Sequence, residues 1–309
     1  MSRRLVIGSR GSKLALWQAE QAKARLHALF PEIDVSIDII KTTGDVKTDP
    51  LSVIGGKGVF TKELEDALLN GRIDLAVHSL KDLPTLLPDG LTISAICERE
   101  DPRDALVLRD DLKARGGSIL NLPERAVVGT SSQRRVSQLK SLRPDVVVKD
   151  VRGNVDTRLR KLDEGQYEAL ILASAGLRRL ELEHRIDAAI SIEEMVPAVG
   201  QGAIAIETRA DDTFTLETTG SLDHEETRSC CLAERAFLRS LGGGCQFPIA
   251  GHAIVEDEVL KLDGLVATPD GAKILRDQLS GSPNNPEELG QSLAQQLIER
   301  GANSLLNSH

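Results

Sequence analysis

Hydrophobic residues recur along this chain with two alternating periods, that of a strand and that of a helix. Short apolar runs such as 5–8 and 35–40 have the length and composition of strands. Between them lies an amphipathic stretch that Ser12 caps and Pro31 ends, which predicts a helix over 12–29. The alternation predicts an α/β fold with mainly parallel sheets. It continues with a helix at 61–69 and strands at 74–77, 92–97, 105–108, 126–129, 146–151, 169–173 and 203–207.

Two breaks interrupt the alternation, a charged one at 98–104 and a Pro- and Gly-rich one at 195–202. They bracket a complete run of strands and helices, which predicts an inserted domain at 99–199. The chain then returns to complete a discontinuous first domain, 1–98 with 200–218. Two α/β lobes joined by two crossing segments follow the hinge-and-cleft plan of periplasmic binding proteins.

The pattern changes beyond residue 220. Asp223 and Glu226 form a capping arrangement that opens a helix ending at Leu241. A final helix over 287–300 follows Pro286. Three strands lie between the helices, the last two joined by a Thr-Pro-Asp-Gly turn: 249–255, 259–267 and 273–279. We predict a smaller C-terminal α+β domain over 219–309.

Composition limits the classes of function. The chain has 309 residues, 40% of them hydrophobic and 28% charged, which is typical of a soluble protein with two or three domains. It has no apolar run near the ~20 residues that span a bilayer. Its net charge of −9 argues against nucleic acid as a partner, and its four cysteines lack metal-ligand spacing. We expect a cytoplasmic monomer with reduced thiols, without a metal and without a nucleic-acid or membrane partner.

Positive charge is concentrated in one part of this acidic chain. Residues 125–185 contain 13 Lys and Arg against 8 Asp and Glu. Arginine predominates there, and its planar guanidinium suits carboxylate or phosphate groups. A solvated basic surface is one explanation, and a binding site for an anion is the other.

The positions of these arginines favour the anion site. Arg134 and Arg135 fall in the first turn of a predicted helix, where the dipole disfavours cations and the free N–H groups favour an anion. Arg152 ends a predicted strand, and Arg158 and Arg179 follow strand ends. Because strand ends of an open α/β sheet form its ligand site, we predict one crevice lined by these side chains, for a multiply anionic ligand.

Polar groups follow two more predicted strands. The segment 8–12 offers a further anion-binding turn with Arg10. The segment 78–84 places Lys81 and Asp82 before a proline, which suits a surface ion pair or a functional carboxylate. The glycine-rich segment 55–60 lacks the pattern of a phosphate-binding loop and is also explained as an ordinary connection.

One cysteine stands apart from the other three. Cys245 lies in the loop Gly-Gly-Gly-Cys-Gln-Phe-Pro at 242–248, between a predicted helix and a predicted strand. Most unpaired cysteines are small buried hydrophobic residues, and the other three fit that role. Glycines and a proline instead favour a displayed thiol. No nearby base is evident, so the thiol suits a covalent tether better than a hydrolytic nucleophile.

These segments together resemble the porphobilinogen deaminases, also called hydroxymethylbilane synthases, over nearly the whole chain. The resemblance is least specific in the last sixty residues. The motifs that carry it are 8–10 with 14–19, 55–58, 78–84, 97–104, 129–135, 152–155, 197–202 and 243–245.

The resemblance implies a chemistry that the tether interpretation fits. A dipyrromethane cofactor, made from two substrate molecules, would be bound to Cys245 through a thioether. Four porphobilinogen molecules would be added in turn with loss of ammonia, and water would release hydroxymethylbilane. Asp82 would be the essential carboxylate, because its charge can stabilise the cationic methylene-pyrrole that forms as ammonia leaves.

The same resemblance implies the other site residues. The cofactor would be bound by Lys57, Ser79, Lys81, Asp82, Thr130, Ser131, Ser132, Arg134, Arg135, Arg152 and Gly153. The substrate would be bound by Arg10, Ser12, Phe60, Arg152, Arg158 and Arg179. Two positions depart from the family pattern, Gly242 and Phe247, and we expect both to alter loop packing and not chemistry.

Two other functions would use part of this pattern. A carboxylate-binding protein of the solute-receptor type would share the fold and the arginines, but it would have no use for Cys245 or Asp82. A thiol acyl-transfer enzyme would use Cys245, but it would need a positioned base. A deaminase would use the arginines, Cys245 and Asp82.

Overall fold

A computed structural model of the chain describes residues 3–43, 61–244 and 247–306. These residues form two compact units, Met1–Arg99 with Ala203–Arg228, and Glu100–Gly202 with Ser229–His309. The second unit therefore includes both the predicted inserted domain and most of the predicted C-terminal domain. The boundaries of the three predicted domains stay a prediction.

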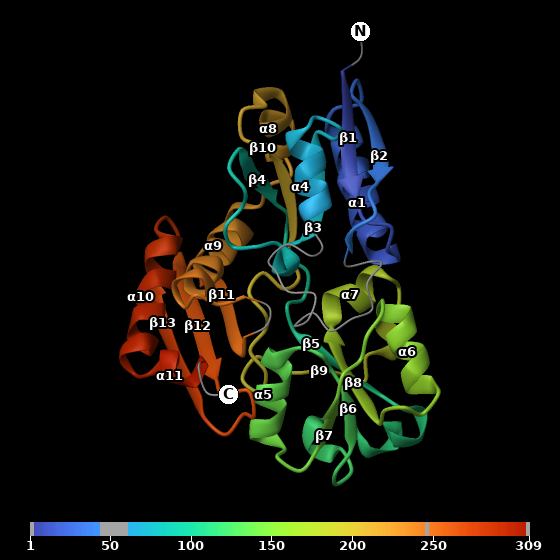
Figure 1. Cartoon of the computed structure of the whole chain (residues 1–309), viewed down its shortest axis with the longest axis vertical. Helices are drawn as coiled ribbons and strands as arrows, with labels where there is room; N and C mark the ends of the chain where they lie inside the picture. The colour runs from blue at the N-terminus through green and yellow to red at the C-terminus, as the bar shows by residue number, and fades with distance from the viewer. Residues whose placement is uncertain (1–2, 44–60, 245–246, 307–309) are drawn as a thin grey trace. The chain divides into compact units, whose positions relative to one another are not determined.

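The first unit is built on a five-stranded sheet in the order β2-β1-β3-β10-β4. Its strands are β1 (Arg4–Ser9), β2 (Asp34–Ile39), β3 (Leu75–Ser79), β4 (Leu91–Ile96) and β10 (Ile204–Arg209). Its helices are α1 (Lys13–Leu29), α4 (Lys62–Leu69) and α8 (Thr213–Gly220). Alternate strand residues face opposite sides: Leu75 and Val77 pack with residues of α1, and Ala76 packs with residues of α4. Figure 1 shows α4 beside β3 and β10.

The second unit contains a sheet in the order β7-β6-β8-β5-β9. Its strands are β5 (Asp104–Leu108), β6 (Val127–Gly129), β7 (Val147–Lys149), β8 (Ala169–Ala173) and β9 (Ala188–Ala189). Its helices are α5 (Gln133–Leu142), α6 (Val155–Asp163) and α7 (Ser174–Arg179), with short 3₁₀ turns η2 (Asp110–Arg115), η3 (Ile119–Asn121) and η4 (Glu183–Arg185). Leu139 of α5 packs on one face, whereas Leu159 of α6 and Leu177 of α7 pack on the other.

The two sheets share one topology. Each has three parallel strands with the earliest in the middle, followed by a strand that runs antiparallel to its neighbours. That antiparallel strand is β10 in the first unit and β5 in the second, and each directly follows a crossing of the chain between units. The α/β fold is confirmed, and so is the prediction of mainly parallel strands, because four of the five strands in each sheet run in one direction. The one reversed strand in each sheet was not predicted. Periodicity shows where strands occur and not which way a strand runs after the chain returns.

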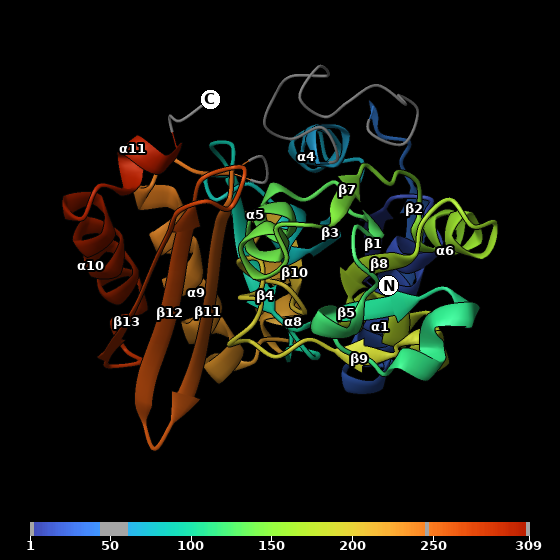
Figure 2. The same ribbon diagram turned by 90° about the horizontal axis from the view of Figure 1, so that it is seen from below.

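The C-terminal part forms a separate antiparallel sheet, as predicted. Strands β11 (Ile249–Glu256), β12 (Val259–Ala267) and β13 (Ile274–Gly281) lie side by side (Figure 2). Their core includes side chains of α9 (Glu225–Ser240), α10 (Pro286–Glu299) and α11 (Ala302–Leu306). Phe237 is fully buried at its centre, and a Cβ at Gly264 would stand 2.7 Å from Cζ of that ring. A glycine in the middle of β12 therefore makes room for the aromatic side chain.

We predict that Phe237→Ala destabilises this core strongly. Removal of a buried phenylalanine ring costs about 3–5 kcal/mol of unfolding free energy, because the cavity fills only in part. Amide hydrogen exchange along β12, which reports local opening, measures the effect. Phe247→Ala is the matched control, because this ring is 39% exposed and its loss should cost less than about 1 kcal/mol. Equal protection loss in the two variants would contradict the prediction.

Candidate active site

Three of the residues predicted for the site lie outside the described residues: Lys57, Phe60 and Cys245. The remaining residues fall into two groups, one in each compact unit. Each group lies where strands of a sheet end. A crevice that joins the two groups stays a prediction.

Asp82 lies at the end of a short 3₁₀ turn, η1 (Leu80–Asp82), directly after β3. Two buried leucines fix this turn. Leu80 is 1% exposed, and its N–H donates to the Ala203 carbonyl at 3.0 Å. The N–H of Leu83 closes the turn by donating to the Leu80 carbonyl at 3.1 Å. Asp82 itself is exposed, and Lys81 is half-buried. The turn therefore presents a carboxylate at the surface on a rigid apolar base.

Arg10, Ser12 and Ser79 lie near the same edge of that sheet. β1 and β3 run parallel and pair through Ile7 and Gly8, so their carboxyl ends lie together. The Ser12 hydroxyl caps α1 by accepting from the Ala15 N–H at 3.3 Å, and Ser79 accepts from the Gln18 side chain at 2.8 Å. Both hydroxyls therefore have structural partners, and Arg10 is half-buried beside them.

In the second unit, Thr130, Ser131 and Ser132 follow β6. The Ser131 hydroxyl donates to the Val151 carbonyl at 3.0 Å and accepts from the Val151 N–H at 3.1 Å. It therefore ties the end of β6 to the chain that leaves β7. Thr130 is 1% exposed, and its hydroxyl accepts from the Ser132 N–H at 3.3 Å.

The turn after β7 brings Arg152, Gly153 and Arg158 together. Gly153 has a φ of +103°, which favours glycine, and a Cβ there would stand 2.7 Å from Thr157. The Gly153 carbonyl accepts from Nε of Arg158 at 2.8 Å, and the Arg152 carbonyl accepts from Lys161 at 3.2 Å. Both arginine side chains are half-buried, so their guanidiniums are held near the surface of this unit.

Arg134 and Arg135 are placed differently from the prediction. Both side chains are buried in this structure, and both pair with the fully buried carboxylate of Asp104, at 2.6 Å and 2.7 Å. The anion that the helix N-terminus led us to expect is thus supplied here by the chain itself. Burial opposes ionisation of Asp104, but the charges of the two arginines outweigh it and hold the pKa of the carboxyl well below its ordinary value.

Arg179 is also buried, and its Nη2 donates to the Gly202 carbonyl at 2.6 Å. Sequence reasoning missed Asp104, and it missed Gln201, whose side chain donates to Asp104 at 2.9 Å and to the Pro102 carbonyl at 2.7 Å. The available signal was an acidic residue at the start of a buried strand, where an unpaired carboxylate would be costly.

This part of the second unit has more positive charge and more hydrogen-bond donors than its described acceptors satisfy. Two guanidiniums share one carboxylate, which leaves one excess positive charge in a buried region. Within the described part of the chain, Nε of Arg134 and the hydroxyl of Ser174 are buried without a hydrogen-bond partner. Buried polar atoms are seldom left unpaired, so this arrangement fits an anionic ligand with several acceptor oxygens.

A second buried charged cluster lies in the first unit. Nε2 of His78 lies 3.0 Å from Glu207, both side chains are almost fully buried, and Glu65 of α4 interacts with both. Burial, and then the charge of Glu207, raises the pKa of Glu65 above its ordinary 4.5, although the nearby Thr61 hydroxyl opposes the shift. No set of three metal-ligating side chains in the described ranges is arranged to hold a metal ion.

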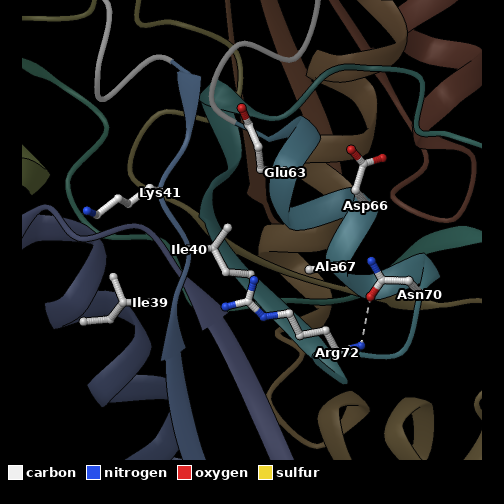
Figure 3. A pocket seen from close by; sticks show the side chains of 8 residues that line it. All are labelled: Ile39, Ile40, Lys41, Glu63, Asp66, Ala67, Asn70 and Arg72. Carbon is white, nitrogen blue, oxygen red and sulfur yellow. Dashed lines mark hydrogen bonds between the residues drawn. The ribbon is translucent and has the colours of Figure 1, made fainter.

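A surface pocket of about 500 Å³ lies in the first unit (Figure 3). It contains none of the predicted site residues. Its lining mixes both signs of charge, and the backbone N–H of Arg72 donates to Asn70 at 3.2 Å. Lys41 and Glu63 flank residues that the structure does not describe, so we assign no ligand to it. The lining residues are Ile39, Ile40, Lys41, Glu63, Asp66, Ala67, Asn70 and Arg72.

None of the described helices is both long enough and apolar enough to cross a membrane.

Comparison with known proteins points to one family. A family model described as "Porphobilinogen deaminase, dipyromethane cofactor binding domain" matches residues 5–217, and one for the C-terminal domain matches 228–299. The chain is 52% identical to the porphobilinogen deaminase of Nitrosomonas europaea, over 98% of this chain and 97% of that protein. It is 49% identical to that of Chlorobium phaeovibrioides, over 99% of this chain and 98% of that protein.

A solved extracellular-binding protein of a probable amino-acid ABC transporter from Bacillus subtilis aligns less closely. Its TM-score is 0.41 at 11% identity, over 71% of this chain and 90% of that chain. No conclusion about function follows from a likeness of this size.

We predict that Glu65→Gln stabilises the protein more as pH rises. Because the pKa of Glu65 is raised on folding, the stability that its proton contributes is complete below the unfolded pKa near 4.5 and is lost as pH rises through the folded pKa. A neutral glutamine avoids that loss. Thermal unfolding at pH 5 and pH 8 measures it, with Asp66→Asn, an exposed neighbour on α4, as the control. A Glu65→Gln variant destabilised equally at both pH values would refute the account.

Proposed function

The chain belongs to the porphobilinogen deaminase family, and we propose that it carries out the synthesis of hydroxymethylbilane. The enzyme condenses four porphobilinogen molecules with loss of ammonia, and hydrolysis releases the linear product. The observation that supports this most directly is identity of about half the residues over nearly the full length of named deaminases. A solute receptor is not favoured, because the full-length relatives of this chain are named porphobilinogen deaminases.

The cofactor of this family is dipyrromethane, whose acetate and propionate side arms carry negative charge. The second unit fits such a group, since it has excess buried positive charge and two buried donors, Arg134 Nε and the Ser174 hydroxyl, that lack partners in the described part of the chain. When bound, the cofactor supplies the pyrrole carbon to which the first substrate is added. We assign its carboxylates to Arg134, Arg135 and Arg152, with Thr130, Ser132 and the Gly153 backbone as neighbouring contacts. Ser131 acts by holding two strand ends together.

We assign the covalent attachment to Cys245. The other three cysteines, Cys97, Cys230 and Cys231, are buried. We also assign Lys57, Ser79, Lys81 and Asp82 of the first unit to cofactor binding.

Asp82 is the proposed catalytic residue. Its position on a rigid turn fixes the carboxylate, so the charge need not be reorganised when positive charge develops on the substrate. The protonated amine of porphobilinogen leaves as ammonia and keeps the electron pair of the broken C–N bond. A cationic methylene-pyrrole remains. A carboxylate beside that cation lowers the barrier, and it can receive the proton that the attacked pyrrole carbon loses once the new C–C bond has formed.

Arg10, Arg152 and Arg158 are the proposed contacts for substrate carboxylates, because all three are half-buried, the first two shortly after strands and Arg158 on α6. Phe60 is assigned to the same site. Ser12 and Arg179 already have structural partners, so we assign them a supporting role. We further propose that the enzyme works as a monomer in the cytoplasm, where its four cysteines would stay reduced.

The first prediction from this function concerns the tether. The purified protein should have a mass excess of two deaminated porphobilinogen units, and Cys245→Ser should lack it, because serine does not form the thioether. Intact-mass spectrometry measures both. Cys97→Ser, which replaces a buried thiol, should keep the full excess. An active enzyme without added mass would overturn the assignment.

The second prediction concerns Asp82. Asp82→Asn should fold and keep the mass excess, yet turn over about 10²- to 10⁴-fold more slowly, since the amide has neither the charge nor the basicity. Steady-state consumption of porphobilinogen measures the rate. Asp89→Asn, a nearby exposed aspartate, serves as the control and should be near normal. Normal turnover by Asp82→Asn would remove this residue from the mechanism.

A further inference from the structure

Asp104 is the first residue of β5, and its carboxylate is fully buried. Arg134 donates to both of its oxygens, at 2.6 Å and 3.3 Å. Arg135 donates twice to Oδ1, at 3.1 Å and 2.7 Å. Both guanidiniums are thereby oriented by one carboxylate, which contains no atom at the surface.

Among the described residues, the other hydrogen bonds that the two guanidiniums donate go to carbonyls. Arg134 also donates to the Val196 carbonyl at 2.9 Å, and Arg135 to the Ile171 carbonyl at 3.0 Å. These partners carry no full charge. Without Asp104, no carboxylate of the described residues would pair with these two buried guanidiniums, which is strongly unfavourable.

The same carboxylate also fixes the segment by which the chain leaves the second unit. Gln201 donates to Asp104, and both Arg134 and Gln138 donate to Val196. At the other side of this segment, Glu234 of α9 accepts from the Gly200 and Ala253 N–H groups at 2.7 Å and 2.8 Å. Asp104 therefore links the guanidiniums to a part of the backbone that is itself held in place.

We propose that Asp104 is a positioning residue for cofactor loading: it keeps the guanidiniums of Arg134 and Arg135 assembled before the anionic pyrrole primer binds. This inference rests on the proposed function. Asp104 neutralises only one of the two charges, so the assembled pair still attracts carboxylates. When a cofactor carboxylate binds, the donors are already oriented, so binding does not include the entropy cost of ordering these two side chains.

The test separates positioning from simple stability. Full-length apoprotein of each variant, made in cells that cannot form porphobilinogen, is incubated with porphobilinogen, and intact-mass spectrometry follows the gain of the two-unit mass excess. Asp104→Asn should load on the order of 10- to 100-fold more slowly than the unaltered protein. Asp104→Glu keeps the charge but moves it, so its loading rate should lie between the two.

Asp263→Asn is the matched control. Asp263 is another buried aspartate, paired with Arg276 at 2.5 Å in the C-terminal sheet. This variant should lose thermal stability but load at the normal rate. A normal rate for folded Asp104→Asn, or equal slowing by Asp263→Asn, would overturn the proposal.

Two further outcomes remain decisive. If Asp104→Asn does not fold, the folded Asp104→Glu variant decides: slowed loading supports positioning, and a normal rate refutes it. Failure of the unaltered apoprotein to gain any mass would instead contradict the proposed function, and so the two failures are distinguishable.

Discussion

The interaction on which the second unit depends is the buried carboxylate of Asp104 between two guanidiniums. A single guanidinium removed from water without a counter-charge costs several kcal/mol, and two neighbouring ones also repel each other. Arg134 and Arg135 can lie inside this unit because Asp104 faces both. Gln201 donates to the same carboxylate. The charge that offsets the cost of burying the two arginines therefore also holds the segment around Gln201 against the sheet.

The topology explains why the proposed site residues gather near strand ends. In each sheet three neighbouring strands run parallel, so their carboxyl ends lie at one edge. Short anchored turns then limit how far each side chain can move: Leu80 and Leu83 fix the turn of Asp82, and Ser131 ties two strand ends together. Catalysis by a fixed charge requires this rigidity, because a carboxylate that must reorient gives up part of its stabilising effect.

Much of the fold could be predicted from the sequence, because burial imposes its period on the residues that face a core. The C-terminal sheet and its helices follow the predicted pattern closely. The direction of β5 and β10 could not be predicted, since period carries no direction. The pairing of Arg134 with Asp104 was missed for a related reason: the partners lie 30 positions apart, and only the fold brings them together. The assignment of site residues stays a prediction, and the partners of these residues within the chain could not be predicted from the sequence.

The arginines of the second unit consequently divide by burial into two kinds. Arg134 and Arg135 are buried and oriented by a permanent counter-ion, so breaking their contacts would be costly. Arg152 and Arg158 are half-buried, and solvent can replace a lost contact at little cost. The first kind suits a ligand that stays bound through every cycle, because its donors never change partner. The second kind can also serve carboxylates that arrive and leave, as those of four successive substrates must, and Arg152 is proposed to contact both the cofactor and the substrate.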